Sequence, residues 1–174
     1  MSLDRSHRPA RGEYAPFYQP YLDAVPDGDI VKTLREGLEA TLFALRAVPE
    51  ERAEHRYAPG KWTLREVLGH ILDTERVFSY RALRIARGDA TPLPGIEQDD
   101  YVREGRFERR PLGELIEEYE FVRRANLLLF NSFDENELGR QGTASGHGVS
   151  VRALVWIVAG HERHHLNTLR DRYL

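Results

Sequence analysis

The stretch that decides the fold class runs from Thr63 to Ile71 and reads TLREVLGHI. Thr63, followed by Glu66 three residues later, forms a capping-box pattern, in which the two side chains cap the first turn of a helix. The apolar residues that follow recur three and four positions apart, as they do on one face of a helix. The sequence therefore predicts an amphipathic helix that opens at Thr63 and stops near Gly88.

Three further stretches have the same character. One opens at Asp29 and runs to Pro49, one starts at Pro111, and one is capped by Ser150 and continues almost to the C-terminus. The glycine-rich stretch 139–148 is interpreted as a mobile loop. With four long amphipathic segments and no convincing strand, we predict an all-α fold, a four-helix bundle with one longer crossover connection.

The chain outside the helices divides into an arm and connections. Residues 1–28 are interpreted as an extended N-terminal arm packed on the bundle, and residues 29–174 as a single bundle domain. On the last predicted helix, Trp156 lies opposite the apolar stripe. A large exposed aromatic there predicts a contact either with the arm or with a second chain, which would make a homodimer.

Composition excludes several classes of function. Lys and Arg number 25 against 28 Asp and Glu, and the basic residues are scattered, so we expect no nucleic-acid partner. No apolar run is long enough to span a bilayer, and the start, 1–5, lacks a signal-peptide core, so we expect no membrane partner and a cytoplasmic location. Without cysteine, a metal site must be built from imidazole, carboxylate and water.

The histidines supply such a site. His161 and His165 are one turn apart on the last predicted helix and share a face. At about 100° per residue, His165 falls inside the apolar face, His161 at its edge and His164 outside it. His70 lies at the edge of the stripe of the helix that opens at Thr63. A groove between the two helices could bring His70, His161 and His165 together around a metal. From spacing alone, histidines that merely pack in the core remain an alternative.

The run from His161 to His165 also fits the H-E-x-x-H pattern of zinc proteases. Those enzymes can take a third ligand downstream, whereas the residues after His165 include no further histidine, so a third ligand should come from upstream. Glu162 and Glu75 both fall in apolar stripes, and we interpret them as partners in a buried salt bridge with Arg81. The alternative for Glu162 is orientation of a ligand imidazole, or general-base catalysis.

Two histidine-bearing motifs and two weaker stretches share a familiar pattern. They are Tyr57–Thr63 (YAPGKWT) with Glu66 and His70, Gly160–Glu162 (GHE) with His164 and His165, Tyr14–Asp29, and Pro94–Tyr101. Together they resemble the DinB-like superfamily over most of the chain. The resemblance implies a four-helix bundle that binds zinc, nickel or iron through His70, His161 and His165. Characterised relatives include S-transferases and isomerases that depend on low-molecular-weight thiols, and others are described as metal-dependent hydrolases.

Two functions follow. The first is a metal-dependent transferase or hydrolase, in which a small-molecule thiol or water becomes the nucleophile at an open metal position. Trp62, Gln98 and Asp100 are its candidate substrate-binding residues, and Glu162 is its candidate catalytic residue. The alternative is a non-catalytic stress-response or binding protein with a structural or vestigial metal. A structural site predicts four protein ligands, whereas a catalytic site predicts an open cavity.

Overall fold

The structure is a computed structural model that describes residues 5–174. The first four residues of the predicted arm, which also belong to the stretch considered for a signal peptide, lie outside the described residues. The long helices are α2 (Ile30–Arg46), α3 (Leu64–Ala86), α5 (Leu112–Ser132) and α7 (Val151–Arg172). The short elements are α1 (Gln19–Asp23), α4 (Gln98–Gly105), α6 (Glu135–Gly139), β1 (Gln141–Ala144), β2 (His147–Ser150) and four 3-10 turns (Arg11–Glu13, Pro16–Tyr18, Glu50–Arg52 and Phe107–Arg109).

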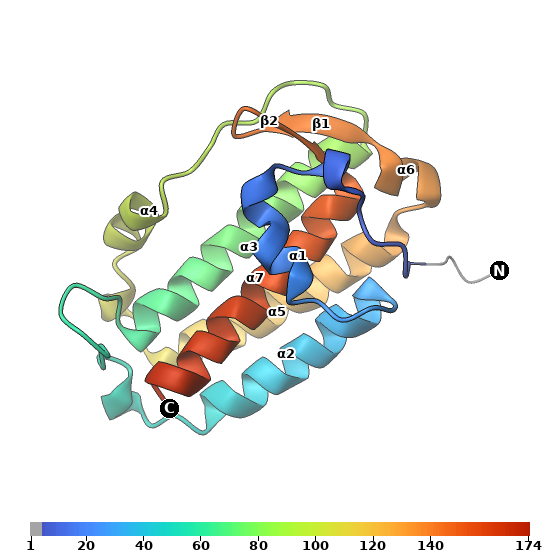
Figure 1. The fold of residues 1–174 in the computed structure, drawn as a ribbon. Coiled ribbons are helices and arrows are strands. Elements are labelled where there is room, and N and C mark those ends of the chain that lie inside the picture. The colour runs from blue at the N-terminus through green and yellow to red at the C-terminus, as the bar shows by residue number, and fades with distance from the viewer. Residues whose placement is uncertain (1–4) are drawn as a thin grey trace.

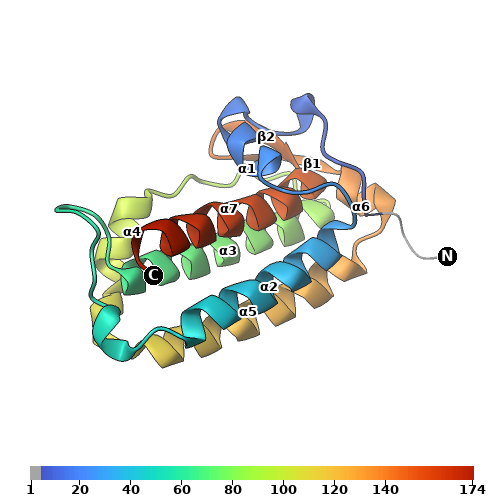
Figure 2. The ribbon, with the colours of Figure 1, turned by 60° about the horizontal axis from the view of Figure 1, so that its bottom comes forward.

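The long helices form the predicted four-helix bundle. Both α2 and α3 pack against α5 and α7. Figure 1 shows that α2 and α7 run in one direction and α3 and α5 in the other. Figure 2 shows the two layers, α3 with α7 and α2 with α5. The connection 47–63 from α2 to α3 therefore crosses the end of the bundle, next to α4 and the C-terminal end of α7.

Local capping confirms the predicted starts of three helices. Asp29 Oδ1 accepts hydrogen bonds from the first-turn backbone of α2 at 2.8 and 3.0 Å. Thr63 and Glu66 form the reciprocal capping box of α3, with bonds of 3.1 and 2.7 Å. Ser150 Oγ accepts a hydrogen bond of 2.9 Å from the backbone of Ala153 in α7. Each cap satisfies backbone N–H groups that have no partner inside the helix.

The prediction of no strand, with a mobile loop at 139–148, is wrong. Strands β1 and β2 pair antiparallel in this stretch. Ser145 and Gly146, with φ of 53° and 78°, form the two-residue turn that matches the twist of a hairpin. Leu93 donates a backbone hydrogen bond of 2.9 Å to Thr143, so the connection before α4 is tied to the hairpin. The strands were missed because they are short and rich in glycine, without a clear alternation of apolar and polar residues.

The N-terminal arm contains the short helix α1 and two 3-10 turns within residues 5–28, joined by segments without regular structure. It lies over α7 on the side away from the α2–α5 layer (Figures 1 and 2). Gly160 in α7 allows this contact, because a Cβ at that position would overlap the carbonyl oxygen of Tyr21. Ser150 at the start of α7 also donates a hydrogen bond of 2.6 Å to Glu13 of the arm.

Of the two contacts predicted for Trp156, the structure shows the one with the N-terminal arm. The Trp156 side chain is 1% exposed, and the Arg8 guanidinium of the arm lies 4.7 Å from the centre of its ring. The arm is thus the cover for this face of α7. The homodimer loses the observation on which it was based and stays a prediction.

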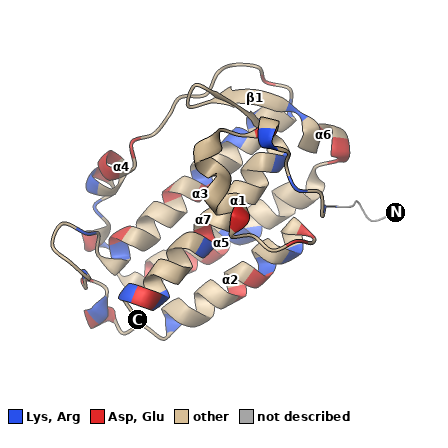
Figure 3. Ribbon diagram, viewed as in Figure 1, with Lys and Arg blue, Asp and Glu red and all other residues tan. Residues whose placement is uncertain are grey.

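The outer surface carries charges of both signs. Figure 3 shows acidic and basic residues interspersed along the long helices, none of which carries charges of one sign alone. Among the described residues, no helix combines the length and the apolar character needed to cross a membrane.

Candidate metal centre

The three histidines come together between α3 and α7. His70 lies in α3, and His161 and His165 lie one turn apart in α7. The Nε2 atom of His161 is 3.0 Å from that of His70 and 3.1 Å from that of His165. One possible ligand atom from each residue lies within 4.8 Å of the other two. The three imidazoles therefore converge on one point.

This donor set fits a divalent transition metal. Nitrogen ligands at about 2.0–2.1 Å from a metal in a tetrahedral shell lie about 3.4 Å apart. The Nε2–Nε2 distances of 3.0 and 3.1 Å are close to this value. Burial lowers the pKa of His70 to about 4 and that of His165 to about 3, and it lowers the pKa of His161 well below its usual value. All three imidazoles are therefore neutral at pH 7, the form that binds a metal.

A cavity of about 440 Å³ opens beside the histidines, at the end of the bundle where α4, the α2–α3 connection and the end of α7 meet. His165 lines it, together with Tyr57, Lys61, Trp62, Gln98, Asp99 and Tyr173. The cavity explains why His165 is half-buried while His161 is fully buried, the reverse of the order that the helical wheel predicts. His165 lies nearer the end of α7, where the cavity exposes one side of its ring.

Two aromatic side chains pack against the histidine rings. The ring of Trp62 lies 4.8 Å from that of His70, centre to centre. Tyr21 of the arm lies 5.5 Å from the ring of His161 and 5.6 Å from that of His164, both edge-on. Tyr21 is absent from the predicted site because the contact depends on the arm crossing α7 at a glycine, and no local sequence pattern encodes that crossing.

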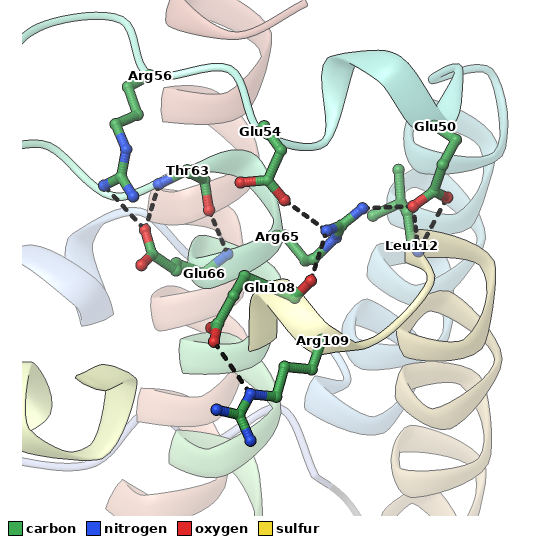
Figure 4. A network of polar contacts seen from close by, with 9 residues as sticks. All are labelled: Glu50, Glu54, Arg56, Thr63, Arg65, Glu66, Glu108, Arg109 and Leu112. Carbon is green, nitrogen blue, oxygen red and sulfur yellow. Dashed lines mark hydrogen bonds and ion pairs between the residues drawn. The ribbon is translucent and has the colours of Figure 1, made fainter. Parts of the chain in front are cut away.

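Ion pairs fix the start of α3, which positions His70. Figure 4 shows Arg65 between the carboxylates of Glu50 and Glu54, and it also donates to the carbonyl oxygen of Glu108 at 3.1 Å. In the same view Arg56 pairs with Glu66 of the capping box at 3.0 Å. The connection before α3 and the turn after α4 are thus held on the first turns of the helix.

Glu75 and Glu162 belong to a buried ion-pair network, as predicted, but the predicted partner is wrong. Arg123 of α5 donates to both oxygens of Glu75 at 2.7 and 2.8 Å, and to Glu162 at 2.6 Å. Tyr119 also donates to Glu162. Arg81 instead donates to the carbonyl oxygen of Pro94 at 2.7 Å, so it holds the connection before α4. The guanidinium of Arg123 reaches both carboxylates because α5 packs against α3 with this residue facing the bundle axis.

The arginine carries its charge despite complete burial. Burial disfavours the charged guanidinium, but the carboxylates of Glu162 and Glu75 outweigh it and raise the pKa of Arg123 well above its usual value. Gly37 of α2 makes room for Glu162, since a Cβ there would lie 2.6 Å from the carboxylate oxygen. The direction of Glu162 is thus set by its contacts with α2 and α5.

The remaining predicted residues divide between the cavity and the surface. Trp62 and Gln98 line the cavity, whereas Asp100 is not among its lining residues and pairs with Arg103 at 2.7 Å. Asp99, one residue earlier, takes its place in the cavity wall. His164 is exposed, as the wheel predicts, and lines the outer part of the cavity.

A larger hollow, of about 700 Å³, lies between the end of α2 and the start of α5. Its lining includes Glu114, Glu117 and Glu120 but none of the three converging histidines. The smaller cavity is the one that borders the histidine cluster, since His165 lines it.

Comparisons with known proteins agree with this picture. A family model for the DinB superfamily matches residues 33–169. Among solved structures, YfiT from Bacillus subtilis, described as a probable metal-dependent hydrolase with an unusual four-helix bundle topology, is similar with a TM-score of 0.67 and 10% identity, over 95% of this chain and 91% of that chain. A mycothiol-dependent maleylpyruvate isomerase is similar with a TM-score of 0.66 and 13% identity, over 83% of this chain and 59% of that chain.

At these identities the two structures establish a shared fold and no more. Comparison with curated proteins found no match. The family match covers most of the sequence, including all three converging histidines. The resemblance stated from the sequence is confirmed: the chain belongs to the DinB superfamily.

Proposed function

We propose that this chain is a metal-dependent enzyme that acts on a small molecule, with a divalent metal held by His70, His161 and His165. The observation that carries the proposal is the convergence of three neutral imidazoles beside a cavity of about 440 Å³. Three neutral ligands leave the metal charge uncancelled and a coordination position open, so a bound ion would lower the pKa of a thiol or water there.

The side chains of the site bind, cover and orient. Trp62 and Tyr21 cover the rings of His70 and His161, which keeps water from their faces and limits their rotation. The cavity receives the substrate on the side of His165. Glu162 supports the helix and does not supply a base, because its carboxylate is occupied by Arg123, Tyr119 and Thr41.

The structural neighbours support both chemistries that the sequence analysis left open. One is described as a probable metal-dependent hydrolase and the other as a mycothiol-dependent isomerase. We therefore propose activation of a thiol or of water as the reaction class. The choice among zinc, nickel and iron, the homodimer and the cytoplasmic location stay predictions.

The number of ligands favours an enzyme over a protein with a structural or vestigial metal. Structural zinc sites have four protein ligands. Within residues 5–174, the group of side chains that could hold an ion consists of the three histidines, without a carboxylate as a fourth member.

Metal content of matched histidine variants tests the proposal. His165→Ala should lower metal affinity more than about a hundredfold, since loss of a direct ligand exceeds the 10–100-fold typical of supporting residues. His164→Ala, at the preceding position of the same helix, should change metal affinity less than about threefold, because His164 is exposed and outside the ligand group. Equal losses from both, or no metal in wild-type protein after reconstitution, would overturn the assignment.

Activity is then measured on the metal-loaded protein. Consumption of a thiol against a panel of electrophiles, beside hydrolysis of activated esters, separates the two chemistries. Either activity should be lost with His165→Ala.

A further inference from the structure

The cavity wall carries a cation and an anion that lack a hydrogen-bond or ion-pair partner among residues 5–174. Lys61 and Asp99 both line the cavity, and neither side chain has a hydrogen bond or ion pair with another residue of the described chain. Their counterparts elsewhere are paired: Lys32 lies 3.7 Å from Glu36, and Asp100, the residue after Asp99, is 2.7 Å from its arginine partner. The two unpaired charges therefore face the same hollow.

The wall that presents Lys61 is braced. Arg56 donates a hydrogen bond of 2.6 Å to the carbonyl oxygen of Lys61, while also pairing with Glu66 of α3 (Figure 4). Tyr173, beyond the end of α7, donates a hydrogen bond of 2.7 Å to the carbonyl oxygen of Trp62. Consecutive carbonyl groups outside any helix are thus held by distant side chains, so the backbone is fixed before a ligand arrives.

A second part of the cavity wall, α4, packs against α3. Phe107, in the turn after α4, is buried in the space left by Gly69, since a Cβ on that glycine would overlap its ring. Asp99 stands in the first turn of this helix. His165 lines the same cavity, so the Asp99 carboxylate and one of the three converging histidines border one space.

We propose that the cavity binds a small zwitterion, with its carboxylate toward Lys61, its ammonium group toward Asp99 and a metal-binding group toward the histidines. Of these three contacts, only the one between the metal-binding group and the histidines rests on the proposed metal-dependent function. A molecule with only negative or only positive groups would satisfy one wall and set a like charge against the other, which disfavours it. The rings of Trp62 and Tyr57 line the space between and contact the carbon skeleton.

Four small thiols separate the two charges. Cysteine carries both charged groups, cysteamine only the ammonium, 3-mercaptopropionate only the carboxylate, and 2-mercaptoethanol neither. Each is titrated into cobalt-loaded protein, and the thiolate-to-cobalt absorption gives the dissociation constant. Lys61→Gln should weaken cysteine and 3-mercaptopropionate about fivefold and leave the other two unchanged. Asp99→Asn should weaken cysteine and cysteamine by the same factor and leave the other two unchanged.

Comparing each probe with itself across variants cancels the different acidities of the thiols. Lys32→Gln and Asp100→Asn are the matched controls, because they remove the same charges outside the cavity wall. Neither should change any of the four constants. The same titrations on metal-free protein, followed by calorimetry, should show the same charge dependence at lower affinity.

The outcomes separate the two proposals. If the protein takes up no cobalt, the metal proposal fails, and the metal-free titrations still decide the zwitterion. If cobalt binds but Lys61→Gln and Asp99→Asn change all four probes equally, or none of them, the zwitterion proposal is overturned and the metal site stands.

Discussion

Two clusters of polar side chains lie inside the same bundle, at adjacent positions of α7, and they are built in opposite ways. In the cluster around Glu162, all four carboxylate oxygens of Glu75 and Glu162 accept hydrogen bonds, and Arg123 is fully buried between them. In the cluster around His161, the imidazole nitrogens at 3.0 and 3.1 Å face one another. A saturated network stabilises the fold, whereas neutral donors directed at one point are poised for a ligand.

The largest effect should come from Arg123→Met. The substitution leaves two buried carboxylates without their cation, so we expect a loss of about 3–5 kcal/mol in the free energy of unfolding. Arg124→Met is the control, since Arg124 is 53% exposed and pairs with Glu120 at 2.7 Å on the surface, and it should cost at most about 1 kcal/mol. Urea denaturation measures both. Similar small losses would mean that the buried network is not a stabilising element.

Glu162→Gln should lower the free energy of unfolding by less, about 2 kcal/mol. Glutamine keeps the shape of the side chain, but one charge and part of its capacity to accept hydrogen bonds are lost. If the two clusters have separate roles, metal affinity and turnover per bound metal should each fall less than about tenfold. Unfolding, metal content and single-turnover rate are measured on the same preparation. A variant with full stability and full metal but almost no turnover would make Glu162 the catalytic base.

The fold could be predicted to the extent that its signals are local. The caps at Asp29, Thr63 and Ser150 act within one turn, so three helix starts are correct. The hairpin and the burial of Trp156 are not local. They depend on the pairing of Leu93 with β1 and on the arm crossing α7, and apolar periodicity does not reveal what covers the outer face of a helix.

The candidate site, like the fold, could be predicted only where its signals are local. Spacing on one helix selects His161 and His165, and the structure brings them to His70. The choice between Asp99 and Asp100 depends on where a short helix starts, because one residue rotates the side chain by about 100°. The incorrect choice of Arg81 in place of Arg123 as the partner of the buried glutamates has a similar cause, because the pairing depends on the rotation of α5 against its neighbours.

The pH dependence of stability should reveal the histidine cluster in metal-free protein. The pKa of His70 falls from 6.5 in the unfolded chain to about 4 in the fold, chiefly through burial. Between these values the unfolded chain binds more protons, so stability is complete above pH 6.5 and declines as the pH falls toward 4. The shift of His70 alone should lower the free energy of unfolding by about 1 kcal/mol between pH 6.5 and 5.5.

Urea titrations across this range measure the decline. His70→Phe should make the decline shallower, because it removes one imidazole whose pKa burial lowers. A free energy of unfolding that stays constant between pH 6.5 and 5.5 would show that the imidazoles become protonated in the folded protein without loss of stability. The histidine cluster would then not differ from the buried ion-pair network in the way argued above.

The smallest effect should come from Thr74→Val, which tests whether the histidine cluster has any support of its own. The Thr74 hydroxyl is buried one turn from His70, with 3.5 Å between Oγ1 and Nδ1, longer than an ordinary hydrogen bond. Valine keeps the shape, so metal affinity should fall only about threefold, below the range for a well-formed supporting bond. Thr168→Val, at the cavity rim, should leave affinity unchanged. A loss beyond about tenfold for Thr74→Val alone would show that this bond tightens when the metal binds, and that His70 is held from behind much as Glu162 is.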